Sequence, residues 1–122
     1  MLFPIPFVIR AGIAIAGICI AFAAPPALAL AQRTFVASYG SDASATCALA
    51  APCRSFNAAI AQTSGGGEVV ILDTAGYGSM VITKAIKVIG PSGVYGGISA
   101  ITPGTDGITI NAGDGDIVIL RG

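Results

Sequence analysis

Residues 68–89 read EVVILDTAGYGSMVITKAIKVI and decide the fold, because short runs of β-branched residues follow one another there with only turn residues between them. Runs of this kind lie at residues 69–72, 80–83, 86–89, 98–101, 108–110 and 117–120. Such runs predict short strands, and clusters rich in Gly, Pro, Asp and Ser predict the turns that separate them. The spacing leaves no room for crossover helices, so residues 68–122 are expected to be all-β.

Two all-β architectures compete, an antiparallel sandwich or meander and a solenoid. With three strands in each coil, the fourth, fifth and sixth runs would lie over the first, second and third. The corresponding offsets are similar, 29 residues from Val69 to Ile98, 27 from Val81 to Ile108 and 31 from Ile86 to Ile117. A regular meander also spaces its strands evenly. The runs show little polar alternation and no Asn-Gly hairpin, which favours parallel strands stacked into about two coils with shared apolar ladders.

Residues 32–67 lack the repeated β-branched runs and are expected to cap this stack of strands. Thr34, Phe35 and Val36 predict a short leading strand within residues 32–38, followed by a loop over residues 39–52. A short amphipathic helix is predicted over residues 54–63, with Ser55 capping its start and the glycine triplet 65–67 ending it.

The first 31 residues resemble an export signal. Arg10 precedes an uncharged run at residues 11–24, and Ala29 and Ala31 form an A-x-A site, so cleavage is expected between Ala31 and Gln32. The alternative is an uncleaved membrane anchor. Tandem prolines at residues 25–26 argue against it, because they end the apolar helix short of the roughly 20 residues that span a bilayer. We expect a secreted, periplasmic or cell-surface protein with no stable membrane span after processing.

Export also determines which chemistry is expected of the cysteines. Cys47 and Cys53 lie six positions apart, and an oxidising compartment favours a local disulfide between them. Two free buried thiols are the alternative. A metal site is not expected, because two thiols without any imidazole make a poor ligand set.

Composition excludes several classes of function. The chain is 54% hydrophobic and 10% charged, which is too apolar for a disordered protein. Six basic and six acidic residues leave no net charge, so binding of nucleic acid by charge is not expected. Histidine is absent, which removes Ser-His-Asp and Cys-His catalysis and HExxH zinc sites.

Four short motifs carry a resemblance to a known family. They are RTFVA at 33–37, APCRSFNAAI at 51–60, GGEV at 66–69, and GYG at 76–78 ahead of VITK at 81–84. With them the chain resembles the secreted right-handed parallel β-helix proteins of the pectin lyase-like superfamily. The resemblance implies an N-terminal strand and short helix capping the solenoid. It also implies that polysaccharide-lyase sites would lie on later coils.

Lyases of that kind hold Ca²⁺ with aspartates and take a proton with Arg or Lys, and this chain has residues of those types in its turns and strands. The aspartates that could bind calcium are Asp106, Asp114 and Asp116, and the basic residues are Lys84, Lys87 and Arg121. The aspartates are more simply explained as turn residues, and the lysines as outward positions on adjoining strands. We therefore assign no catalytic residue and no cofactor, with calcium at the aspartates as the alternative.

Two surfaces are candidates for partners. Tyr39, Tyr77 and Tyr95 either stack on sugar rings or pack over the ends of coils. The run 117–120 would leave its outer edge open, which predicts a fragment of a longer protein or self-association through that end. The expected function is a non-catalytic exported scaffold that binds polysaccharide or another β-helix chain. The alternative is the N-terminal fragment of a polysaccharide lyase or glycoside hydrolase.

Overall fold

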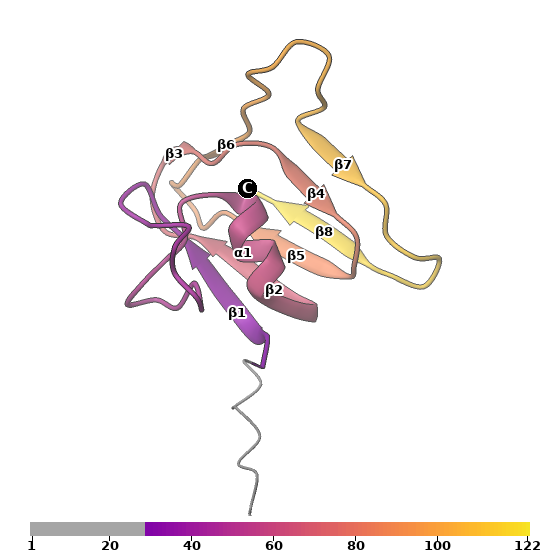
Figure 1. Ribbon diagram of the computed structural model, residues 1–122, viewed down its shortest axis with the longest axis horizontal. Coiled ribbons are helices and arrows are strands. Elements are labelled where there is room, and N and C mark those ends of the chain that lie inside the picture. The colour runs from indigo at the N-terminus through magenta and orange to yellow at the C-terminus, as the bar shows by residue number, and fades with distance from the viewer. Residues whose placement is uncertain (1–28) are drawn as a thin grey trace, which may run out of the picture.

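The computed structural model describes residues 29–122, which form eight short strands and one short helix (Figure 1). The elements in chain order are β1 (Ala31–Val36), α1 (Phe56–Gln62), β2 (Thr63–Ile71), β3 (Ala75–Gly76), β4 (Met80–Ile82), β5 (Ile86–Ile89), β6 (Gly96–Gly97), β7 (Ile108–Ile110) and β8 (Val118–Arg121). Most of the predicted export signal, including its expected helix, lies outside the described residues.

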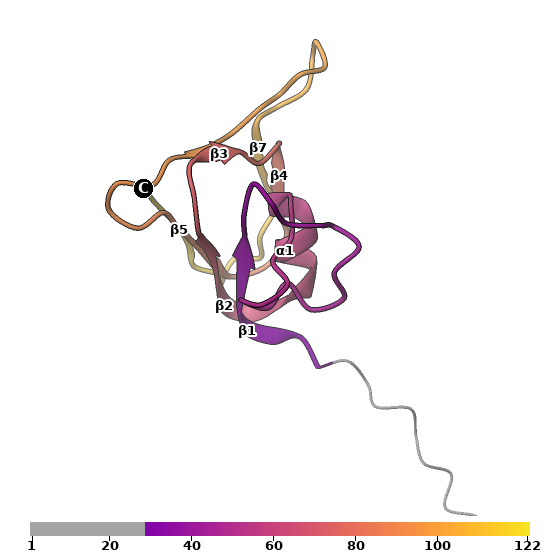
Figure 2. The same ribbon diagram turned by 90° about the vertical axis from the view of Figure 1, so that its left-hand side faces the viewer.

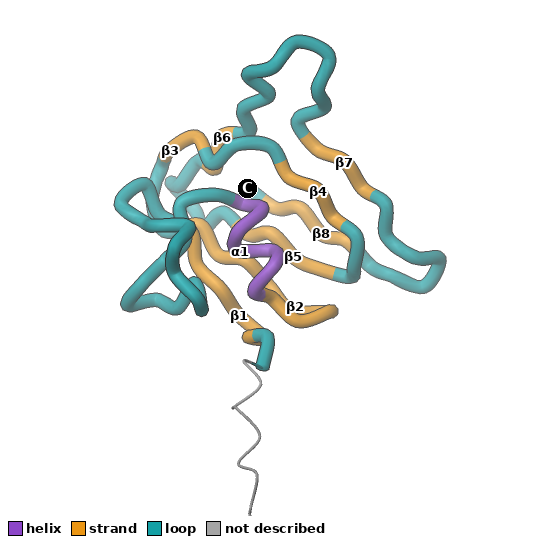
Figure 3. Tube along the Cα trace, viewed as in Figure 1, coloured by secondary structure: helices purple, strands orange, loops and turns teal. Residues whose placement is uncertain are grey.

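The strands form three sheets in which every pairing between strands is parallel. One sheet has the order β1-β2-β5-β8, and two smaller sheets pair β3 with β6 and β4 with β7 (Figure 3). The chain visits the sheets in the same order twice before β8 returns to the first. Seen from the side of β1, strands β2, β3 and β4 lie around a common interior (Figure 2). The described residues are therefore mostly parallel strands with one short helix, and the all-β expectation is confirmed at this level.

The predicted stacking is right for two pairs of runs and wrong for the third. β7 pairs with β4 and β8 pairs with β5, each one residue away from the predicted register, with Met80 opposite Ile108 and Ile86 opposite Val118. The run 98–101 forms no strand. Instead β5 lies beside β2, and the second turn of the chain crosses the middle sheet through the two glycines of β6. The short strands β3 and β6, which have no β-branched residues, provide the middle strand of each turn, so β5 begins the second turn instead of ending the first. Glycine is required in β6, because a Cβ on Gly96 would lie 2.2 Å from the Ile71 Cδ1 atom.

The helix forms where it is predicted but ends earlier. Ser55 is its N-cap, and its hydroxyl accepts a hydrogen bond from the Ala58 amide at 3.3 Å. The prediction that the glycine triplet ends the helix is wrong, because Thr63 is the C-cap and its amide donates to the Ile60 carbonyl. The triplet lies inside β2, where the pairing with β1 shifts register. Gly66 has φ +80°, a conformation that glycine adopts without strain and that suits such a bulge.

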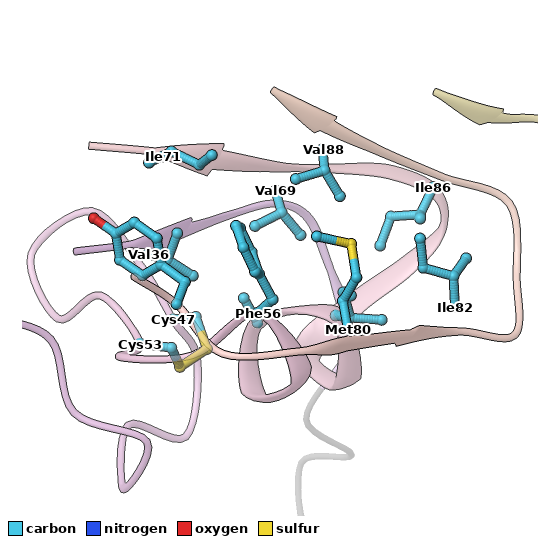
Figure 4. Close-up of a cluster of buried hydrophobic side chains, with 13 residues drawn as sticks. Val36, Cys47, Cys53, Phe56, Val69, Ile71, Met80, Ile82, Ile86 and Val88 are labelled. Atoms are coloured by element: carbon cyan, nitrogen blue, oxygen red, sulfur yellow. A yellow bond between two sulfur atoms is a disulfide. The ribbon is translucent and has the colours of Figure 1, made fainter. Parts of the chain in front are cut away.

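The core lies between the sheets and α1. Val69 and Val88 occupy one ladder of adjacent strands and point toward Phe56 and Met80 (Figure 4). The ring of Phe56 packs against that of Tyr77 with centroids 5.3 Å apart. Stacked apolar ladders of this kind bury side chains that no single turn of the chain could cover. Within residues 29–122, no helix is long and apolar enough to cross a bilayer.

Candidate functional site

The loop between β1 and α1 is closed by the disulfide between Cys47 and Cys53. Both residues are fully buried, and their Cα atoms are 4.8 Å apart. The predicted disulfide is therefore confirmed, and the alternative of two free thiols is wrong. The link fixes the base of the loop against the hydrophobic core, which both cysteines join.

Backbone hydrogen bonds attach this loop to the outer edge of β1. The Phe35 amide donates to the Cys47 carbonyl at 2.8 Å, and the Phe35 carbonyl accepts from the Cys53 amide at 2.9 Å. The Ala37 amide also donates to the Cys53 carbonyl at 3.0 Å. A Cβ on Gly40 would lie 2.2 Å from the Cys53 carbonyl oxygen, so the chain approaches itself more closely there than any other residue permits. The loop is thus held along both of its arms.

Polar side chains inside the loop hold its own backbone. One carboxylate oxygen of Asp42 accepts from the amides of Arg54 and Ser55, both at 2.8 Å, at the point where the helix begins. The Ser44 hydroxyl donates to the Ala51 carbonyl at 2.7 Å and accepts from the Cys47 amide at 3.1 Å. These bonds order the loop before any ligand arrives, which reduces the entropy lost on binding.

A concave surface of about 410 Å³ lies on this ordered loop. We call it the Tyr39 site, and its lining residues are Tyr39, Gly40, Ser41, Ala43, Ser44, Ala50, Ala51 and Pro52. Tyr39 is the one large side chain among them and is 71% exposed. All eight lining residues are uncharged. The volume falls in the range of small-molecule sites, where apolar walls and a few polar atoms set orientation.

The Tyr39 site presents an aromatic face and small polar groups that a ligand could contact. An exposed aromatic face offers a large apolar surface with a negative quadrupole, which suits the C–H groups on one side of a sugar ring. The surrounding residues are small enough to let a flat ring approach, and the Ser41 hydroxyl can donate a hydrogen bond to a ligand hydroxyl. The lining side chains include no carboxylate, amine, guanidinium, imidazole or thiol.

The three tyrosines that the sequence singles out differ in their exposure. Tyr39 and Tyr95 are exposed, by 71% and 77%, and are free to stack on a ligand. Tyr77 is buried in the core beside Phe56, so it is not placed to stack on a sugar ring. The guanidinium of Arg54 lies 5.6 Å from the centre of the Tyr77 ring and donates to the Gly76 carbonyl at 2.8 Å.

A cluster of hydrogen bonds around Asp73 supports the start of the loop. The Asp73 carboxylate accepts from the Ser38 amide at 2.8 Å, from the Ser38 hydroxyl and from the Tyr77 hydroxyl. The bonds from Ser38, followed by the one from Tyr77, hold the pKa of Asp73 below its ordinary value. Burial, together with the neighbouring carboxylate, raises the pKa of Tyr77 well above its usual range. Sequence reasoning missed this cluster, which fixes the residue that directly precedes Tyr39.

The aspartates proposed as calcium ligands lie in two separate loops. Asp106 precedes β7, whereas Asp114 and Asp116 lie between β7 and β8 (Figure 1). The Asp116 carboxylate accepts from the Gly113 amide at 2.9 Å, the local contact expected of a turn residue. Within residues 29–122, no group of three or more His, Cys, Asp or Glu residues is arranged to hold a metal ion.

The basic residues considered for catalysis are also dispersed. Lys87 lies on β5 and is exposed, as predicted for an outward position. The same prediction is wrong for Lys84, which lies in the turn before β5, where its ammonium donates to the carbonyl of Thr63, the C-cap of α1. Burial lowers the pKa of Lys84. Arg121 is exposed at the end of β8.

The predicted cleavage point lies at the first residues of the described fold. Ala31 and Gln32 begin β1, and the Ala31 carbonyl accepts from the Ser64 hydroxyl at 3.3 Å. Cleavage between them would leave the rest of β1 in place.

No protein-family model, curated protein or solved structure matches the chain. The resemblance to pectin lyase-like β-helix proteins rests on the short motifs between residues 33 and 84. The geometry of the Tyr39 site is therefore the main guide to function.

Proposed function

We propose that the protein is an exported right-handed parallel β-helix scaffold that binds a neutral polysaccharide at the Tyr39 site and has no catalytic activity of its own. The repeated order of strands supports the β-helix, since β5, β6 and β7 lie parallel to β2, β3 and β4 in turn. The predicted signal over residues 1–31 and the disulfide support export.

The observation that carries the binding proposal is the exposure of Tyr39 on a loop that is otherwise fixed. A large apolar ring in water is unfavourable unless a ligand covers it, and two rotatable side-chain angles cost little entropy on binding. The disulfide and the hydrogen bonds to β1 hold the backbone that carries the ring. The site is therefore preorganised for a flat ligand, and one face of a pyranose or furanose ring matches its shape and polarity.

The uncharged lining defines the class of sugar. A uronate polymer carries a carboxylate on every residue, and burial of that charge is costly without a cation or an arginine beside it. The Tyr39 site provides neither, because all its lining residues are neutral and the nearby Arg54 guanidinium is engaged with Tyr77 and the Gly76 carbonyl. Neutral polymers such as xylan, galactomannan or a β-glucan fit this surface better than polygalacturonate.

Calorimetric titration with these four polymers tests the proposal. We expect a neutral polymer to bind and Tyr39→Ala to weaken its binding about tenfold, since an aromatic stacking contact contributes on the order of 1 kcal/mol or more. Tyr95→Ala is the matched control, because Tyr95 is similarly exposed but lies outside the site. Circular dichroism checks that both variants fold. Equal affinities for the two variants, or binding of none of the neutral polymers, would refute the assignment.

The absence of catalysis is tested separately. Lyase action on polygalacturonate yields unsaturated uronates that absorb in the ultraviolet, so the protein is incubated with this polymer with and without Ca²⁺. We expect no such product. Calcium-dependent product formation that Asp106→Asn, Asp114→Asn or Asp116→Asn abolishes would instead assign the protein to the lyases.

A further inference from the structure

The backbone amides of the residues that line the Tyr39 site are mostly engaged within the protein. Pro52 has no amide hydrogen, and five of the other seven lining residues donate theirs to groups of the same chain. These five are Gly40, Ser41, Ala43, Ser44 and Ala51, with donor–acceptor distances between 2.9 and 3.3 Å. The acceptors include the Pro52 and Ser41 carbonyls, which lie in the same loop. A ligand therefore meets few backbone donors at this surface.

The side-chain hydroxyls of the site differ in what they have left to offer. The Ser44 hydroxyl both donates, to the Ala51 carbonyl, and accepts, from the Cys47 amide. The Ser41 hydroxyl oxygen accepts from the Ala43 amide at 3.3 Å, and no hydrogen bond within residues 29–122 uses its proton. The Tyr39 hydroxyl lies at the tip of the exposed ring, beyond the face that would stack on a sugar. Ser41 is thus the small lining residue that keeps a side-chain donor for a ligand.

Half of the lining residues present only hydrocarbon side chains, and they are Ala43, Ala50, Ala51 and Pro52. A sugar hydroxyl placed against these side chains gives up its hydrogen bonds to water and gains none in return. A methyl group placed there is favoured, because its apolar surface leaves water. The volume of about 410 Å³ exceeds that of one pyranose ring, so a ring on Tyr39 leaves room beside it for a substituent.

We propose that the Tyr39 site selects neutral sugars that carry an O-acetyl group. This inference rests on the proposed function and specifies its ligand. An acetyl ester replaces the proton of a sugar hydroxyl with a methyl group and a carbonyl oxygen. The methyl group packs against Ala43, Ala50 and Pro52, and the carbonyl oxygen accepts from the Ser41 hydroxyl. The ester carries no charge, which suits a lining without acids or bases.

A matched pair of ligands tests this selectivity directly. Water-extracted xylo- and manno-oligosaccharides that retain their acetyl esters are titrated calorimetrically beside portions of the same samples after alkaline removal of the esters. We expect the acetylated form of at least one sugar to bind about tenfold more tightly, because it adds a buried methyl group and one hydrogen bond. Equal affinities, or tighter binding of the saponified form, would overturn the acetyl proposal and leave the neutral-sugar site in place. Binding of neither form would refute the sugar site itself.

Variants of the lining residues identify the groups that read the ester. Ser41→Ala should reduce the tenfold preference to about threefold, while Ser41→Thr, which keeps a hydroxyl, should retain it. Ala50→Ser should also reduce the preference by adding a polar group to the apolar wall, whereas Tyr39→Ala should weaken both ligands alike.

The preference compares two ligands on one variant, so a general loss of loop structure lowers both affinities and does not imitate the expected result. Circular dichroism checks that each variant folds. An unchanged preference in both Ser41→Ala and Ala50→Ser, or its equal loss in Ser41→Ala and Ser41→Thr, would overturn the proposal.

Discussion

Replacement of Gly96 by alanine tests how closely the second turn of the chain packs on the first. A Cβ at this position would lie 2.2 Å from the Ile71 Cδ1 atom and 3.2 Å from the Phe56 Cζ atom. Overpacking of a well-filled core typically destabilises a protein by about 1–3 kcal/mol. Replacing glycine also lowers the conformational entropy of the unfolded chain, which stabilises the folded state by about 0.4–1 kcal/mol. We expect Gly96→Ala to lower the free energy of unfolding by about 1–2 kcal/mol.

A second substitution identifies the cause. Ile71→Val removes the Cδ1 atom and should cost about 0.5–1.5 kcal/mol alone. In the double variant the new methyl group occupies the vacated space, so the combined loss should be smaller than the sum by about 1 kcal/mol. Urea titration followed by circular dichroism measures all three variants, with Gly115→Ala as the control because nothing lies within 4 Å of its added Cβ. Strict additivity, or a Gly96→Ala variant as stable as Gly115→Ala, would refute this packing.

Three further predictions concern the loop that carries Tyr39. Removing the disulfide by Cys47→Ala with Cys53→Ala should cost about 2 kcal/mol in urea titration, because the closed loop is short, and unchanged stability would contradict this. Gly40→Ala should cost about 3 kcal/mol or more, since its Cβ would meet a backbone carbonyl that cannot rotate away, and a loss equal to that of Gly115→Ala would argue against the observed loop. The pKa of Asp73 is depressed in the folded protein, so its contribution to stability is present above its unfolded pKa of about 3.9 and is lost as the pH falls through the lower folded value. Urea midpoints at pH 7 and pH 3 should therefore differ more in wild type than in Asp73→Asn, and equal differences would show that this carboxylate is not the group concerned.

The sequence is informative about strands that carry β-branched residues and silent about those that do not. The runs over β2, β4, β5, β7 and β8 are visible because Val and Ile ladders stabilise them. β3 and β6 are two-residue strands made of Ala and Gly, which have low strand propensity, and they exist because the chain must turn a tight corner against Phe56 and Ile71. The run 98–101 fits the pattern of a strand without a core to face, and both its isoleucines are exposed. The prediction took this run for the strand that lies over residues 69–72, whereas β5 occupies that place beside β2.

The candidate site, too, could be predicted from the sequence only in part. Exposure of Tyr39 follows from how residues 39–52 fold back on β1, and that path depends on backbone contacts between positions far apart in sequence, such as Phe35 with Cys47. The disulfide is predictable from spacing and compartment, because it needs only two cysteines in one short loop. The concavity beside Tyr39 depends on several small residues at once, and no single position in the sequence indicates it.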